Sequence, residues 1–91
     1  MKVLWTPRAT SDLDHMVDFI GKDSTDAAIR VADRLYNQVM QLATMPHIGR
    51  RGDLPGTHEM IFHPWPYIAV YRVTHDSIRI LRIRHASQRW P

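Results

Sequence analysis

The sequence predicts an α+β fold in the order β-α-α-β-β-β, with a helical hairpin packed on one face of a small, mostly antiparallel sheet. Two observations predict this class. Apolar residues recur at helical spacing in two stretches between residues 6 and 45, and three segments rich in Ile, Val and Tyr follow one another between residues 58 and 84. With 91 residues, the chain has room for one hydrophobic core, so we expect residues 1–91 to form a single domain.

The first half of the chain predicts a strand and then a helix. Lys2–Trp5 is a short strand candidate, and Thr6 followed by Pro7 is typical of a helix start, with threonine as the N-cap. The apolar residues that follow fit one face of a helix, and Gly21 ends it. They are Leu13, Met16, Val17 and Ile20.

A second helix is expected to begin near residues 23–25 and to run for about 20 residues, because Pro46 prevents its continuation. The link between the helices is very short, so they should pack as an antiparallel hairpin. The charges of the second helix are balanced, and this disfavours a DNA-reading helix, which needs a basic face.

The second half predicts an antiparallel meander. Residues 46–57 are expected to be a solvated loop, and strands are expected over residues 58–63, 67–73 and 78–84. If Val73 opposes Ile78, strand alternation places an uncharged set of side chains toward the helices. The opposite face then carries Ile68 across from Ile83, with His85 just beyond, unless a bulge inverts the order.

The same map predicts one ion pair. Glu59 would lie diagonal to Arg72 on the face away from the helices, as in an ordinary cross-strand pair. His58 and His63 are separated by an odd number of residues, so a regular strand sends them to opposite faces and disfavours a metal site. We expect no metal and no cofactor.

Charge and composition narrow the partners and the compartment. Residues 36–91 hold seven basic and three acidic side chains, so this half should face an anionic partner, either a nucleic acid or an acidic protein segment. The chain has no Cys, no apolar run long enough to span a bilayer and no signal-peptide pattern. These features predict a cytoplasmic protein that does not bind membranes.

Four blocks in order resemble the toxins of the RelE/ParE superfamily. They are GTHE at residues 56–59, PYIAVYRV at 66–73, ILRIRHA at 80–86 and RWP at 89–91. The second and the last block look most like the ParE branch, although ParE-like chains usually carry Arg where this one has His58. The resemblance implies the toxin half of a type II toxin–antitoxin pair, linked to growth arrest and plasmid maintenance. It also implies a cognate antitoxin, ParD-like or similar, whose extended segment wraps the toxin into a hetero-oligomer.

The superfamily implies two different activities. RelE-like members are ribosome-dependent endoribonucleases that cut mRNA, whereas ParE-like members inhibit DNA gyrase and are not nucleases. RelE-like members resemble Tyr-Arg-Leu-Val-Tyr where this chain has Tyr-Ile-Ala-Val-Tyr, so Ile68 replaces an arginine that binds phosphate. This substitution favours the gyrase inhibitor over the enzyme. A third hypothesis is an inactive relative that serves as a binding or regulatory module.

Two sets of candidate site residues follow from the resemblance. For gyrase binding we expect a contact surface rich in Arg and Trp, the side chains that often dominate interfaces. It comprises Arg82, Arg84, His85, Arg89 and Trp90. For the ribonuclease hypothesis, His63, Arg84 and His85 are the candidate catalytic residues, because a histidine with a pKa near neutrality serves as acid or base.

Overall fold

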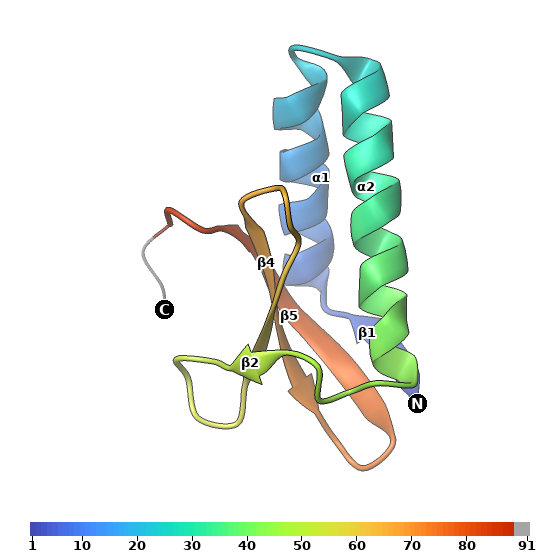
Figure 1. Cartoon of the computed structure of the whole chain (residues 1–91), viewed down its shortest axis with the longest axis vertical. Helices are drawn as coiled ribbons and strands as arrows, with labels where there is room; N and C mark the ends of the chain where they lie inside the picture. Colours follow the sequence, from blue (N-terminus) through green and yellow to red (C-terminus); the bar gives the residue numbers. More distant parts are fainter. Residues whose placement is uncertain (89–91) are drawn as a thin grey trace.

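The two helices begin at the capping residues that the sequence predicts. In the computed structural model, which describes residues 1–88, α1 (Pro7–Gly21) follows Thr6, whose hydroxyl accepts a hydrogen bond of 3.2 Å from the Ala9 amide. Ser24 caps α2 (Thr25–Met40) in the same way, with a bond of 3.1 Å from the Ala27 amide. The helices form an antiparallel hairpin whose tip extends beyond the sheet (Figure 1).

The second helix is shorter than predicted. α2 holds 16 residues, and its last turn tightens into the 3₁₀ helix η1 (Gln41–Ala43) before the chain reaches Pro46. The helical segment therefore ends before Pro46, as predicted. Its last residues, however, form a 3₁₀ helix and do not keep α-helical hydrogen bonding.

The sheet has five strands in the order β1-β5-β4-β3-β2. The first strand runs parallel to β5, and all other neighbours are antiparallel, which confirms the predicted fold class. The bounds of the strands are β1 (Lys2–Trp5), β2 (Arg50–Arg51), β3 (His58–Ile61), β4 (Tyr67–Val73) and β5 (Ser77–His85).

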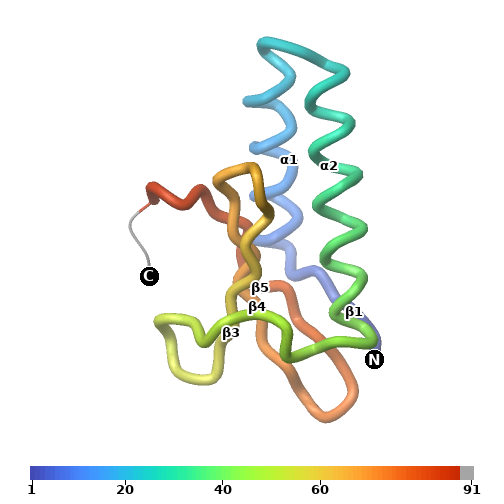
Figure 2. The backbone as a smooth tube through the Cα atoms, viewed as in Figure 1, coloured from blue at the N-terminus to red at the C-terminus, as the bar shows by residue number. Residues whose placement is uncertain are grey.

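The two-residue strand β2 was not predicted. Residues 46–57, expected to be a loop, follow η1 to the edge of the sheet and add β2 there before turning back into β3 (Figures 1 and 2). Tyr71 of β4 holds the start of this segment. Its hydroxyl donates to the Pro46 carbonyl and accepts from the Gly49 amide, both at 3.0 Å.

Next to the turn between β4 and β5, the helices cover the face of the sheet that strand alternation predicted. Val73 lies opposite Ile78 and Tyr71 opposite Ile80, as predicted. Tyr71, Ile78 and Ile80 are fully buried. They pack in one core cluster with side chains from both helices, Leu35, Val39 and Met16 among them.

A β-bulge in β5 changes the faces further along the strand. The register shifts between Val70 and Tyr71, because Tyr71 lies opposite Ile80 but Val70 lies opposite Arg82, so Leu81 has no partner on β4. Ile83 therefore opposes Ala69 on the helix side. The prediction that Ile68 lies across from Ile83 is wrong, since the bulge brings Arg84 to that place.

Candidate functional site

A buried carboxylate organises the face of the sheet that points away from the helices. Glu59 of β3 is only 3% exposed, and two arginines bind it from opposite sides. Arg50 of β2 donates from Nε and Nη2 to Oε1 at 3.1 and 2.9 Å, whereas Nη2 of Arg84 lies 3.6 Å from Oε2. The Arg84 side chain is 8% exposed, so this contact sets a negative charge beside a buried guanidinium.

This cluster corrects the predicted ion pair. Glu59 and Arg72 do share a face, as predicted, but Glu59 pairs with Arg50 and Arg84 instead of Arg72. The reason is geometric. Arg50 lies directly opposite Glu59 on the unpredicted strand β2, and the bulge turns Arg84 onto the same face. Arg72 is exposed and lies close to Gly56, whose φ of 77° is in the region that favours glycine.

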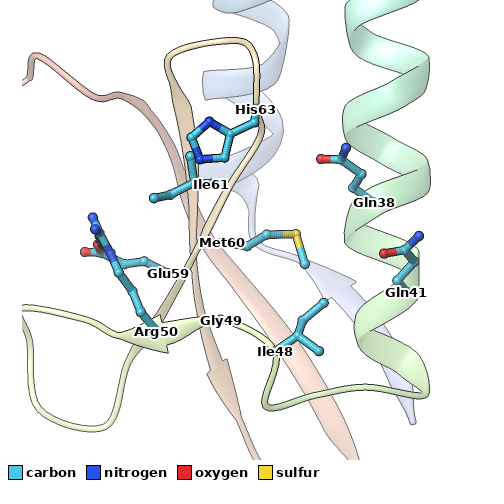
Figure 3. A pocket seen from close by; sticks show the side chains of 9 residues that line it. All are labelled: Gln38, Gln41, Ile48, Gly49, Arg50, Glu59, Met60, Ile61 and His63. Atoms are coloured by element: carbon cyan, nitrogen blue, oxygen red, sulfur yellow. Dashed lines mark hydrogen bonds and ion pairs between the residues drawn. The ribbon is translucent and has the colours of Figure 1, made fainter.

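Beside this cluster, a groove of about 480 Å³ follows the outer edge of β3. Figure 3 shows its walls: Met60 points toward α2, whereas Glu59, Arg50 and Ile61 lie on the other side of the strand. Gly49 belongs to the lining and admits no side chain, because a Cβ there would lie 2.5 Å from the Tyr71 hydroxyl oxygen. The complete lining is Gln38, Gln41, Ile48, Gly49, Arg50, Glu59, Met60, Ile61 and His63.

Arg82 is bound on the opposite edge of the sheet. Its Nε donates to Asp12 of α1 at 2.7 Å, and the same carboxylate oxygen accepts from the Ile83 amide at 3.0 Å. The parallel strand β1 pairs with β5 only over Ser77–Ile80. Beyond the end of β1, the carboxylate of Asp12 accepts the hydrogen bond from the β5 backbone at Ile83. This contact joins α1 to the end of β5 through a charge-assisted bond.

His85 lies on the helix side of β5, opposite Tyr67, and their rings meet edge to face at 5.4 Å. The Ser87 amide donates to its Nδ1 at 3.1 Å, so the neutral imidazole carries its proton on Nε2. His85 and Tyr67 line a second pocket, of about 290 Å³, together with Asp12, His15, Met16, Phe19, Ile83 and Gln88. Burial raises the pKa of the Tyr67 phenol.

The candidate ribonuclease residues are not brought together. Arg84 and His85 are neighbours on a strand and point to opposite faces, Arg84 toward Glu59 and His85 into the pocket beside α1. His63 is exposed and lines the groove at β3. Of the predicted gyrase contacts, Arg82 and Arg84 are held by acids within the fold, and Arg89 and Trp90 lie outside the described residues.

Within residues 1–88, no three His, Asp or Glu side chains are arranged so that they could hold a metal ion. No helix in this part of the chain combines the length and the apolar character that crossing a membrane requires.

Sequence reasoning missed three residues of these sites. Arg50 was taken as part of a solvated loop, because a strand of two residues leaves no periodic signal. Ile61 was treated only as a strand residue, since nothing in the sequence tells which edge of a meander stays open. Asp12 was not proposed as a site residue. Its position at i−4 from the buried Met16 could have suggested a contact at the border of the core.

Comparisons with known proteins agree on one family. Residues 3–90 match the family described as "ParE toxin of type II toxin-antitoxin system, parDE". The chain is 41% identical over 90 residues to "Putative toxin Y4kP" of Sinorhizobium fredii, covering 99% of this chain and 93% of the relative. It is 39% identical over 87 residues to "Toxin RelE2" of Caulobacter vibrioides, covering 96% and 97%.

Solved structures show the same fold. A chain of the "Chromosomal ParDE TA system from P. aeruginosa" superposes with a TM-score of 0.85 at 29% identity, covering 96% of this chain and 97% of that one. The "YoeB/ParE toxin from Agrobacterium tumefaciens" superposes with a TM-score of 0.63 at 17% identity, covering 93% and 98%, and this likeness concerns the fold alone.

Proposed function

The chain belongs to the ParE toxin family of type II toxin–antitoxin systems, within the RelE/ParE superfamily, and from this premise we propose that it inhibits DNA gyrase. In this proposal the toxin acts by binding the enzyme and catalyses no reaction of its own. A cognate antitoxin neutralises it in a hetero-oligomeric complex.

The observation that carries the proposal is the state of Arg84. It stands opposite Ile68, at the place where cleavage of RNA would require a cation for the scissile phosphate. Its guanidinium is buried and paired with the carboxylate of Glu59, so a phosphate would have to compete with an acid of the fold to reach it. His85, the next residue, faces the other side of the sheet. Arg84 and His85 are therefore not presented together as a cation and a general base, which supports an inhibitor that does not cut RNA.

The second candidate function is the ribosome-dependent mRNA endonuclease. One observation favours it: a relative at 39% identity carries the name "Toxin RelE2". His63 and Arg50 line one groove and would be the nearest candidates for an acid–base group and a cation in that case. Glu59 opposes this hypothesis, because its carboxylate binds the guanidinium groups of both Arg50 and Arg84, and a phosphate would have to compete with it for these donors.

We place the contact with gyrase at the C-terminal end of β5 and the residues that follow it. His85 lines an open pocket there, and Arg89 and Trp90 come next in the sequence. The paired guanidinium groups of Arg82 and Arg84 then support this end of the strand and are not themselves the main contacts.

Expression in a bacterial host tests the proposed function. The chain alone should arrest growth, and co-expression of its cognate antitoxin should restore it. Mapping of mRNA ends in the arrested cells should show no cuts phased with the ribosome. Phased cuts that disappear in His85→Ala would establish the endonuclease instead, and growth without arrest would indicate an inactive relative.

A further inference from the structure

Two arginines stand directly opposite each other near the turn between β4 and β5. Arg72 of β4 pairs with Arg79 of β5 in the sheet register, and both residues are exposed. Each lies between residues that pack in the core, so both guanidinium groups are on the face away from the helices. Like charges at opposite positions of an antiparallel pair, where the Cα atoms are about 5 Å apart, destabilise the sheet.

The fold supplies no acid for this pair. In the described part of the chain, residues 1–88, the side chains of Arg72 and Arg79 take part in no ion pair and no hydrogen bond. Asp76, in the adjoining turn, lies 3.9 Å from His75 instead. The other two arginines of β5 differ, because acids of the fold bind both of them. The repulsion between Arg72 and Arg79 is therefore left uncompensated.

A third cation continues the pair onto β1. Lys2 is exposed and lies opposite Ser77, two residues from Arg79 and on the same face, because the next residue, Val3, packs against the core. Since β5 lies between β1 and β4 (Figure 1), Lys2, Arg79 and Arg72 cross three adjacent strands, which are about 4.8 Å apart. These three residues form a basic row on the face away from the helices.

The loop before β3 restricts one member of the basic row. A Cβ at Gly56 would lie 2.8 Å from Nη1 of Arg72, so the loop backbone packs closely against this guanidinium. A cation that is already confined loses less freedom when it binds an anion.

The basic row fits a phosphate backbone better than an acidic peptide. β4 and β5 are inner strands whose main-chain groups pair within the sheet, so an extended peptide would find no partners for its own main chain on this face. A nucleic acid needs none, because arginine and lysine side chains alone bind its phosphates. The guanidinium of arginine also offers a rigid fork of donors that matches the geometry of a phosphate.

We propose that Lys2, Arg72 and Arg79 bind the phosphate backbone of duplex DNA without reading its sequence. The choice of DNA over RNA rests on the proposed function, because gyrase acts on duplex DNA, whereas the site itself rests on the uncompensated charges. In this proposal the toxin bound to gyrase also holds the DNA of that complex, and the phosphates relieve the repulsion between the two arginines.

Fluorescence anisotropy with a short labelled DNA duplex tests the site on the toxin alone. Arg72→Gln combined with Arg79→Gln should weaken binding at least about tenfold and reduce the slope of log K against log salt by about 2. Arg8→Gln combined with Arg30→Gln removes the same charge from exposed positions on the two helices and should weaken binding less than about twofold. Equal losses in the two double variants would overturn the site.

Competitors identify the occupant. Unlabelled DNA duplexes of unrelated sequence should displace the labelled one equally well, an RNA duplex should do so no better, and polyglutamate at equal charge should do so far less. Preferential displacement by RNA, or displacement by polyglutamate as efficient as by DNA, would overturn duplex DNA as the occupant.

The stability of the free toxin gives a second test. Arg79→Glu replaces the like-charge pair with an opposite-charge pair, so the urea midpoint should rise while DNA binding is lost. Arg79→Gln removes the charge without reversing it, and its midpoint should lie between those of Arg79→Glu and the original. A lower midpoint for Arg79→Glu would contradict the repulsion on which the proposal depends.

The outcomes keep this site apart from the proposed function. Inhibition of gyrase by a toxin that does not bind DNA by itself would overturn the site and leave the function intact. DNA binding through the two arginines, in a toxin that does not inhibit gyrase, would support the site and overturn the function.

Discussion

Arg84 of β5 lies directly opposite Ile68 of β4, and its guanidinium binds the buried carboxylate of Glu59 one strand further on, with 3.6 Å between Nη2 and Oε2. On the face away from the helices, the guanidinium of Arg84 is therefore engaged in a contact within the fold. This relationship links the stability of the sheet to the proposed absence of catalysis.

Replacement of Glu59 by alanine should destabilise the protein strongly. The change would remove the carboxylate that pairs with the buried guanidinium of Arg84, and breaking such a pair costs about 3–5 kcal/mol in the free energy of unfolding. Arg50→Ala is the matched control, because its side chain is largely exposed and its loss should cost about 1 kcal/mol or less. Urea unfolding measures both, and equal losses for the two variants would contradict a buried pair centred on Glu59 and Arg84.

Asp12 should matter more than its neighbour on α1. Asp12→Ala removes the partner of Arg82 and the acceptor for the Ile83 amide, so we expect a loss of about 2 kcal/mol. Asp14→Ala, on an exposed position of the same helix, should change the free energy of unfolding by about 0.5 kcal/mol at most. Thermal or urea unfolding decides, and an Asp12→Ala variant as stable as Asp14→Ala would show that the contact contributes nothing.

Stability should fall at alkaline pH because of Tyr71. Burial raises the pKa of its phenol above the ordinary value of 10.0, although the bond from the Gly49 amide lowers it in part. A raised pKa means that the folded state keeps the proton longer than the unfolded state. The stabilisation is therefore complete below about pH 10 and is lost as pH rises through the folded pKa.

The measurement is the urea midpoint between about pH 8 and pH 11. Tyr71→Phe should be less stable at neutral pH, since the Gly49 amide and the Pro46 carbonyl lose their partner, yet its midpoint should decline less at high pH. Tyr36→Phe, at an exposed position, is the control and should decline like the original. Parallel curves for all three proteins would refute the role of Tyr71.

Adjacent arginines should differ in their effect on the antitoxin. Arg50 lines the groove at β3 and Arg51 does not, so Arg50→Ala should weaken antitoxin binding by about tenfold and Arg51→Ala by less than about twofold. Isothermal titration with the co-expressed partner compares them. Equal effects would mean that the two residues contribute only general positive charge.

The sequence predicted the elements well because their signals are local. Thr6 with Pro7, Gly21 and the apolar spacing of α1 each act within a few residues, and the structure has that helix where they indicate. The pairing of Val73 with Ile78 was also predicted, because a tight turn fixes the register next to it.

The site was harder to predict because it depends on one extra residue. The bulge at Leu81 exchanges the faces of everything after it, so Ile83 moves to the core and Arg84 moves to Glu59. No residue near Leu81 has a backbone signal such as glycine or proline. The partner of Glu59 likewise depends on a two-residue strand, and such a strand has no periodicity to detect.

The central claim is that the toxin blocks gyrase without cutting RNA, and a supercoiling assay with purified protein tests it most directly. Relaxed plasmid, gyrase and ATP should yield less supercoiled product as the toxin is added, and toxin premixed with its antitoxin should have no effect. The same preparation should leave mRNA intact on translating ribosomes. Full supercoiling at every toxin concentration, together with cleavage of that mRNA, would contradict the account.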